Sequence, residues 1–442
     1  MSSNPPVISG VIVRPSSTEE VSEIVKLANR TGYPIILRGG GESANGVTSG
    51  SPTRNIVIDT GRMDQVFDID PANGRVCFGA GIRPSMLDAA LKPYGYFAHT
   101  VLGPYYTDSM GGLLSGVSDG GYPRDMASSG LLWRHLIGFK VVLPNGEIVT
   151  TGAGPDSNRN RDKTYYREAS SPDLTGLFMS AGGAFGIITE ITEMIYKIAT
   201  VSKSFSFSFD TLKDCWDAQD ELAKYTPTLH TQLMIQDMMT MKKFGVQASG
   251  AFCMLLTVDG DCEADVDLRI KRITEICMKK GQPGDAKTDW FATYGMAGTA
   301  DLCRDTCSQV CPFLSWECLY PRTGSMELGL KLAAVMDSHD EETLKKYGAD
   351  KVFYSVPVSN YILVGVTMHW NDEIPGAGEY MLGIWKEGAE LLNKEGYSSA
   401  YTQGNNSKVI SKMWSPQYYN LMKTLKTALD PNNIMCPGLW NL

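Results

Sequence analysis

Apolar positions recur with two different periods along the first 200 residues, which predicts helices and strands mixed along the chain. Between residues 18 and 31 they follow a helical spacing, with Val21 and Val25 one turn apart. Ser17, with Glu20 three residues later, predicts the helix start as a capping box, and Gly32 predicts its end. Short apolar runs predict strands at residues 11–13, 34–37, 55–59, 75–79, 136–143, 147–150 and 187–191.

A different pattern begins near residue 200. Residues 204–209 alternate serine with phenylalanine, which is typical of a strand with one polar face. The run 361–370 also alternates: one face is apolar, and the other carries Tyr361, Thr367 and His369. Helices are predicted at 211–224, 263–280, 376–395 and 416–429, and a further strand at 251–257. The order is mixed α+β, not a regular βαβ alternation.

Composition narrows the class of protein. The chain has 442 residues, 43% of them hydrophobic and 20% charged, which predicts a globular protein of more than one domain. Its net charge of −9 and the lack of a Lys/Arg run argue against a nucleic-acid partner. We find no secretory signal and no run of about 18 apolar residues, so we expect a cytoplasmic protein with reduced cysteines.

Three glycine clusters carry the main functional signal. They are Arg38–Ser43, Asp108–Gly112 and Gly182–Gly186. Glycine allows backbone N–H groups to converge and to approach an anion closely, so three clusters in one half of the chain favour a phosphate-bearing ligand. None has the spacing of a Rossmann or Walker motif, which argues against those two nucleotide-binding folds.

The order of these clusters resembles the FAD-binding domain of the vanillyl-alcohol oxidase/p-cresol methylhydroxylase superfamily. The similar segments are 13–15, 37–43, 58–63, 79–81, 109–112, 137–146 and 186–189, and the closing run 425–438. The resemblance implies an α+β fold with a PCMH-type FAD-binding domain of two α+β subdomains over residues 1–200. It also implies an α+β cap over 201–395, and a C-terminal segment, 396–442, that returns to the FAD domain.

The resemblance implies which residues hold FAD. Loop 38–43 would wrap the pyrophosphate, and the other two clusters would contact the pyrophosphate, the ribityl chain or the ring. The implied residues are Arg38, Gly39, Gly40, Gly41, Glu42, Ser43, Ser109, Gly111, Gly112, Gly182, Gly186 and Ile188. Some relatives place a flavin-linking histidine where this chain has Glu42, so we expect noncovalent FAD.

The resemblance also implies catalysis under the cap, with a small organic alcohol or alkylphenol as hydride donor. The candidate catalytic residues are Tyr401, His369 and Tyr106. Relatives that oxidise alkylphenols follow the matching tyrosine with arginine, but this chain has Thr402, which weakens the case for a phenolate. Each of the three also has a purely structural interpretation, as a packed or satisfied side chain.

Two alternatives stay open at this stage. A 2-hydroxy-acid dehydrogenase of the glycolate/D-lactate type is one, although this chain lacks the histidine-rich cap motif of that branch. A flavin subunit that passes electrons to a partner protein is the other, and a homo-oligomer is equally compatible with the sequence. Cys303, Cys307 and Cys311 are spaced by four, which on one helix cannot close around an ion, so we expect no metal site.

Overall fold

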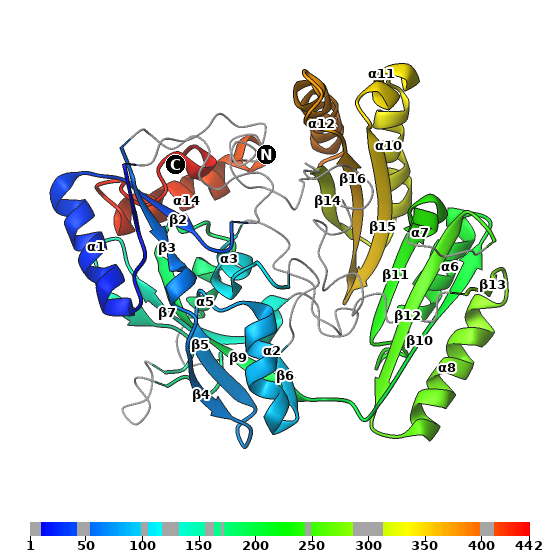
Figure 1. Cartoon of the computed structure of the whole chain (residues 1–442), viewed down its shortest axis with the longest axis horizontal. Coiled ribbons are helices and arrows are strands. Elements are labelled where there is room, and N and C mark those ends of the chain that lie inside the picture. The colour runs from blue at the N-terminus through cyan, green and yellow to red at the C-terminus, as the bar shows by residue number, and fades with distance from the viewer. Residues whose placement is uncertain are drawn as a thin grey trace.

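Two halves, each built around its own β-sheets, make up the molecule (Figure 1). The computed structural model describes residues 10–41, 54–98, 105–116, 132–154, 163–168, 172–243, 249–285, 313–397 and 411–442. The first half, coloured blue to cyan with the red C-terminal segment, holds two sheets. The second half, green to orange, holds one seven-stranded sheet.

A small parallel sheet, in the order β1-β3-β2, opens the first half. Its elements are β1 (Val11–Val13), α1 (Thr18–Thr31), β2 (Ile35–Arg38) and β3 (Ile56–Asp59). The Ser17 hydroxyl accepts a hydrogen bond from the Glu20 amide at 3.2 Å, as the capping box predicts. In a capping box the Glu20 carboxylate would accept from the Ser17 amide. Here it accepts from the amide of the preceding residue, Ser16, at 2.6 Å. Gly32 ends the helix with φ 71°, a left-handed conformation that glycine adopts readily.

A six-stranded sheet completes the first half. Its path is β4-β5-β9-β7-β8, and β6 pairs with β9. Its strands are β4 (Val66–Asp70), β5 (Arg75–Gly79), β6 (Tyr96–Ala98), β7 (Leu136–Val142), β8 (Ile148–Thr150) and β9 (Ile187–Lys197). The associated helices are α2 (Pro84–Leu91), α3 (Met110–Ser115) and α5 (Thr175–Phe178), with the 3₁₀ turn η3 (Leu132–His135). Apolar side chains of these elements form one buried core, which Leu439 and Trp440 from the C-terminal segment join.

The second half is built on an antiparallel sheet in the order β13-β10-β12-β11-β15-β16-β14. Its strands are β10 (Val201–Phe209), β11 (Gln232–Asp237), β12 (Phe252–Gly260), β13 (Gln282–Pro283), β14 (Phe313–Pro321), β15 (Asp350–Val358) and β16 (Tyr361–His369). The sequence pattern predicted β10, β12 and β16 but not β11, β14 and β15. Those three strands mix polar, aromatic and aliphatic residues, so their apolar period is weak.

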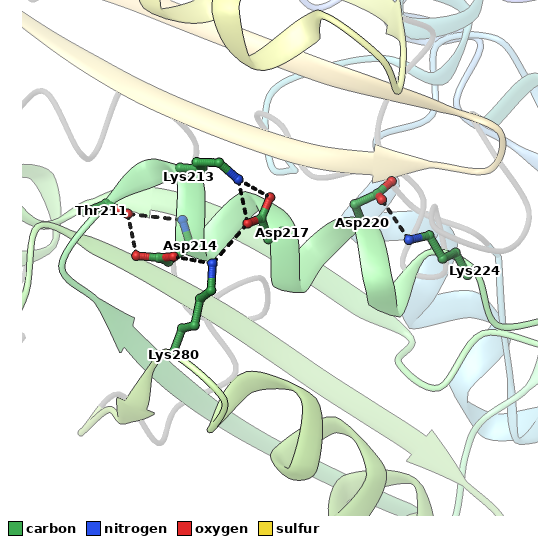
Figure 2. Close-up of polar contacts among 7 residues, drawn as sticks. All are labelled: Thr211, Lys213, Asp214, Asp217, Asp220, Lys224 and Lys280. Atoms are coloured by element: carbon green, nitrogen blue, oxygen red, sulfur yellow. Dashed lines mark hydrogen bonds and ion pairs between the residues drawn. The ribbon is translucent and has the colours of Figure 1, made fainter.

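Helices cover one face of this sheet, which makes that face the core. They are α6 (Leu212–Leu222), α8 (Glu263–Cys277), α10 (Ser325–Asp337) and α12 (Ala377–Lys394), with the shorter α7 (Met238–Lys243) and α11 (Glu341–Lys346). The apolar faces of β16 and β10 enter this core, for example with Val364 and Phe207. On the outside, Lys280 links the end of α8 to Asp214 and Asp217 of α6 at 2.7 and 3.2 Å (Figure 2). These contacts are exposed, so each adds about 1 kcal/mol or less.

The opposite face of the sheet is turned toward the first half, and we call it the inner face. It comprises Ser204, Ser206, Ser208, Cys253, Leu255, Thr257, Gln232, Met234, Gln236, Tyr354, Val356, Val358, Tyr361, Leu363, Gly365, Thr367, His369, Ser315, Glu317 and Leu319. Trp133 of η3 packs against its apolar end, where Val356 and Leu363 lie. Arg134 donates to the Ser359 hydroxyl of the β15–β16 hairpin at 3.4 Å.

The C-terminal segment returns to the first half. After α14 (Pro416–Leu429), Met435 pairs with Ile35 on the free edge of β2, with backbone bonds of 2.7 and 2.9 Å. Lys426 is buried and donates to the Asp430 carboxylate at 2.6 Å, to the Met435 carbonyl at 2.6 Å and to the Ala184 carbonyl at 3.2 Å. Asp430 in turn accepts from the Met435 amide at 2.8 Å. A buried, fully engaged ion pair thus anchors this segment.

Candidate active site

The first two glycine clusters lie in direct contact with each other. The Gly40 amide donates to the Ser109 hydroxyl at 3.2 Å, which ties the loop after β2 to the start of α3. A Cβ on Gly40 would lie 2.2 Å from the Thr107 carbonyl oxygen, and a Cβ on Gly39 would lie 2.3 Å from the Ser109 hydroxyl. Only glycine permits this approach, so both positions are fixed by geometry.

The third cluster joins the same site. The Gly182 amide donates to the Ser115 carbonyl at 2.7 Å, at the end of α3. A Cβ on Gly183 would lie 2.3 Å from a methyl carbon of Leu37, the residue before the first cluster. Three segments that lie far apart in the sequence therefore converge at the carboxyl end of β2, where ligands of open sheets bind.

The amides at the start of α3 are already used within the protein. Met110 donates to the Ile82 carbonyl at 2.9 Å, and Gly111 donates to the Ala80 carbonyl at 2.7 Å. Gly112 donates to the Ser109 hydroxyl at 3.2 Å. Ser109, Gly111 and Gly112 thus help to hold the loop after β2 in place, and their contact with FAD stays a prediction.

The positively charged side chain of Arg38 lies beside that loop. The Arg38 guanidinium donates to the Asp59 carboxylate at 2.7 Å, and its side chain is about half exposed. A Cβ on Gly41, where φ is +83°, would lie 2.9 Å from the same guanidinium. Glycine backbone next to a fixed guanidinium is an arrangement that suits a diphosphate. Glu42 and Ser43, also predicted to contact FAD, lie outside the described residues.

Gly186 and Ile188 lie deeper than the sequence-based interpretation implied. A Cβ on Gly186 would lie 2.7 Å from a methyl of Val141, and Ile188 is buried in the core of the six-stranded sheet. Both positions are explained by the packing of β9 on β7. Their contact with FAD stays a prediction.

Tyr106 lies just before the second cluster and is 56% exposed. It packs edge to face on Tyr105, whose hydroxyl donates to the Asp88 carboxylate at 2.7 Å. Burial, and then the charge of Asp88, raise the pKa of Tyr105, so this phenol stays protonated. Tyr106 is therefore the accessible member of the pair.

A buried carboxyl group lies in the same half. Glu193 on β9 is fully buried, and within the described residues neither of its carboxyl oxygens has a hydrogen-bond partner. Desolvation, and secondarily the charge of Asp88, raise its pKa well above the ordinary value. Burial without a partner therefore favours the neutral form of this carboxyl group.

His369 belongs to the inner face, as its alternation with the apolar residues of β16 predicted. It is partly buried at the end of the strand and pairs in register with Asp350 of β15. Tyr401, the other cap candidate, lies outside the described residues, as do Cys303, Cys307 and Cys311. Within the described residues there is no group of three His, Cys, Asp or Glu residues arranged to hold a metal ion.

Two polar residues at the middle of the inner face are absent from the candidates predicted above. Glu317 on β14 and Tyr354 on β15 both pair with Gly365 of β16. Their strands were not predicted, so no sequence pattern placed these residues on the same face of the sheet as His369. The available signal was the short alternation of Ser315 and Glu317 around the buried Trp316.

Comparison with known proteins identifies the class. Residues 9–152 match the FAD binding domain, and residues 404–439 match the C-terminal domain of FAD linked oxidases. Because the first match includes the Gly39–Gly41 loop and Ser109, the converging clusters are those of an FAD-binding protein. The chain contains an FAD-binding domain, and FAD is its cofactor.

Solved structures agree with this fold. The chain superposes on p-cresol methylhydroxylase with substrate bound with a TM-score of 0.78, at 19% identity, covering 98% of this chain and 88% of that one. For the 4-ethylphenol oxidase of Gulosibacter chungangensis the TM-score is 0.78 at 17% identity, covering 97% and 88%. The chain therefore has the fold of these two proteins.

Curated relatives match part of this chain. The mitochondrial D-lactate dehydrogenase [cytochrome] of Arabidopsis thaliana is 34% identical over 216 residues, which are 48% of this chain and 34% of the relative. The glycolate oxidase subunit GlcD of Bacillus subtilis is 26% identical over 292 residues, 63% of this chain and 57% of the relative. The matches thus span from a third to just over half of these relatives' length. Within the described part of the chain, no helix is long and apolar enough to cross a membrane.

Proposed function

We propose that this protein oxidises a small organic alcohol or an alkylphenol-like molecule, which gives up a hydride at the boundary between the glycine clusters and the inner face. The observation that carries the proposal is the polar inner face, which is turned toward the half that binds FAD. A flavin held by the loop after β2 would lie between the two halves. The substrate would then be enclosed by the sheet.

The proposed roles in binding FAD and substrate fall to different sheets. Residues 1–200 would bind FAD, 201–395 would form the cap over the substrate, and 396–442 would return to the FAD half. The change of sheet between β9 and β10, and the pairing of Met435 with Ile35, support these limits. Arg38 and the backbone of Gly39, Gly40 and Gly41 would hold the pyrophosphate, with Glu42 and Ser43 extending the loop.

The protein's own contribution to the chemistry is position and proton transfer. Bound FAD supplies a two-electron acceptor at its N5 atom. A side chain must take the hydroxyl proton as the carbonyl forms, and it must lie within hydrogen-bond reach of that hydroxyl. Tyr401, His369 and Tyr106 are the candidates drawn from the sequence.

The test combines spectroscopy with rapid mixing. The purified protein should be yellow and should release FAD into the supernatant on acid precipitation, because Glu42 cannot form a histidyl link. Tyr401→Phe, His369→Ala and Tyr106→Phe should each retain FAD. Loss of a side chain that transfers the proton should slow anaerobic flavin reduction on the order of 10²–10⁴-fold.

Two results would contradict this proposal. Flavin that stays with the precipitated polypeptide would show a covalent link. Three variants that all reduce the flavin within about twofold of the parent rate would exclude these residues from the chemistry. Partly buried His339, paired with Glu387 at 3.0 Å on the far side of the cap, offers a matched histidine control.

The second candidate activity is oxidation of a 2-hydroxy acid, and the relatives named D-lactate dehydrogenase and glycolate oxidase favour it. D-lactate and glycolate therefore belong in the substrate panel beside neutral alcohols. Comparing air with an artificial acceptor then distinguishes an oxidase from a dehydrogenase or from a subunit that serves a partner protein.

A further inference from the structure

We propose that the 3₁₀ turn η3 fixes the cap in place over the FAD half, and that Trp133 is its positioning residue. The inference rests on the proposed function, because it names what holds the inner face at a set distance from the bound flavin. Trp133 acts through its contacts with both halves and takes no part in the chemistry itself.

The side chains of η3 divide between the two halves. Leu132 and His135 are 0% and 2% exposed, and Leu132 belongs to the buried core around the six-stranded sheet. The His135 Nδ1 atom lies 2.9 Å from the Tyr196 hydroxyl of β9. Residues three apart lie on the same side of a 3₁₀ helix, so Leu132 and His135 together fix the turn to the FAD half. The two residues between them, Trp133 and Arg134, reach the cap.

Trp133 contacts both halves at once. Among the described residues, it is the one hydrophobic side chain that packs against a buried cluster of the FAD half and also against that of the inner face. On the cap side this cluster contains Val356 and Leu363, which are 3% and 0% exposed and pair in register on β15 and β16. An indole has only two side-chain torsions, so it forms a rigid spacer between the surfaces that it touches.

The backbone of η3 is held from the FAD side. The Arg167 guanidinium donates to the Trp133 carbonyl at 2.8 Å and pairs with the Asp173 carboxylate at 2.7 Å. Asp173 also accepts from the Thr175 amide at 3.0 Å, at the start of α5. The indole therefore stands on a fixed base, and the FAD half sets its position.

A second contact reaches the hairpin of the cap. Arg134 donates to the hydroxyl of Ser359, which follows β15 in the β15–β16 hairpin, at 3.4 Å. The Ser359 carbonyl in turn accepts from Arg322, the residue after β14, at 2.6 Å. With Trp133 on the strands and Arg134 on the hairpin, η3 touches the sheet at two points. Two points of contact limit the tilt of the sheet as well as its approach.

These contacts lie toward one end of β16, and the candidate His369 lies at the other. Leu363 and His369 are both on this strand, about 20 Å apart at roughly 3.3 Å per residue. A tilt of the sheet about η3 by only about 3° would therefore move His369 by about 1 Å. A misplacement of that size can cost on the order of 10² in rate. Loss of the indole should thus slow the chemistry from a distance.

The experiment uses the FAD-loaded full chain and compares Trp133→Phe with Trp414→Phe. Trp414 is also partly buried, but its ring neighbours Tyr418 and Trp440 lie in the C-terminal segment, so it is the matched control for loss of an indole. Benzyl alcohol and D-lactate are the first probes of anaerobic flavin reduction. We expect Trp133→Phe to slow the limiting rate on the order of tenfold and Trp133→Ala on the order of 10²-fold. Trp414→Phe should leave it unchanged, and all variants should keep their FAD.

A second measurement reports the position of the cap directly. Iodide quenching of flavin fluorescence should increase in both Trp133 variants, because a tilted sheet exposes the flavin, and should not increase in Trp414→Phe. Arg134→Ala, at an exposed position, should change rate and quenching in the same direction but by less. Trp133→Ala combined with Leu363→Ala should be no slower than the slower single variant, because both remove one contact.

The quenching measurement needs no substrate, so this inference and the proposed function can fail separately. If no alcohol or hydroxy acid reduces the parent flavin, the proposed function falls, whereas increased quenching in the Trp133 variants still supports the positioning role. If these variants match Trp414→Phe in rate and quenching, Trp133 does not position the cap. A slower rate without a change in quenching would also overturn that role. Should Trp133→Ala fail to fold, Trp133→Phe and Arg134→Ala decide the question.

Discussion

On the two sides of the proposed site, glycine faces different kinds of neighbouring atoms. On the FAD side, two of the glycines lie against backbone: Gly40 faces the Thr107 carbonyl, and Gly111 faces the Ala80 carbonyl. On the cap side, glycine lies against a side chain, since Gly365 faces the ring of Tyr354. Backbone contacts cannot give way, whereas a side chain can rotate. The first side should therefore tolerate no change, and the second should tolerate changes that alter activity without loss of the fold.

Gly40→Val gives the most severe test of this contrast. The new side chain would overlap the Thr107 carbonyl, so the loop after β2 should move and FAD binding should be lost. Loss of a ligand present at 100 times its dissociation constant removes about 2.7 kcal/mol of stability. Flavin absorbance per chain and thermal unfolding measure both effects. Gly383→Val, on α12 where a Cβ meets nothing within 4 Å, is the control; equal flavin loss in both variants would refute the argument.

Lys426→Met tests whether the FAD side depends on its C-terminal anchor. The change leaves the Asp430 carboxylate buried without its cation. Removal of one partner of a buried ion pair costs about 3–5 kcal/mol. Urea unfolding should show a loss of this size, whereas Lys423→Met, at an exposed position of α14, should stay within about 0.5 kcal/mol of the parent. Equal stabilities for the two variants would contradict the anchoring role.

Gly365→Ala sharpens the contrast from the cap side. The added methyl should displace the Tyr354 ring without disturbing the backbone. Because a misplacement of about 1 Å can cost on the order of 10² in rate, flavin reduction by a neutral alcohol should slow by up to that factor. The FAD content and melting temperature of the loaded protein should stay close to the parent values. A colourless Gly365→Ala protein would show that both sides are equally rigid.

Glu193→Gln gives the smallest effect and depends on pH. The folded chain keeps the Glu193 proton, whereas the unfolded chain releases it above the ordinary value of 4.5. The free energy of unfolding of the parent therefore falls as pH rises above that value, by at most about 1.4 kcal/mol per pH unit. The variant cannot ionise, so its curve should be flatter between pH 5 and 7. Parallel curves would disprove a neutral Glu193; Glu147→Gln, at an exposed site, is the control.

The sequence was informative wherever the signal is local. The α1 cap at Ser17, the α14 limits and the glycine clusters all depend on residues a few positions apart. The alternation of β16 likewise predicted its apolar core face, which the structure confirms with Ile362, Val364 and Met368 buried.

Register between distant strands could not be predicted. Glu317 and Tyr354 become neighbours of Gly365 only because β14 and β15 pair with β16 on either side. Likewise, the sequence does not predict that the Met110 and Gly111 amides of α3 donate to the carbonyls of Ile82 and Ala80. Both depend on contacts between segments separated by tens of residues, which no local pattern encodes.

The return of residues 434–436 to the edge of β2 has a consequence for synthesis. Translation delivers β2 early and its edge partner some 400 residues later, so at about 5–20 residues per second the ribosome leaves that edge unfilled for roughly 20 to 80 s. The seven-stranded sheet, encoded without interruption between them, can be completed in that interval. The edge of β2 should therefore be the last strand edge of the molecule to be covered, and until then it is a site for chaperone capture or aggregation.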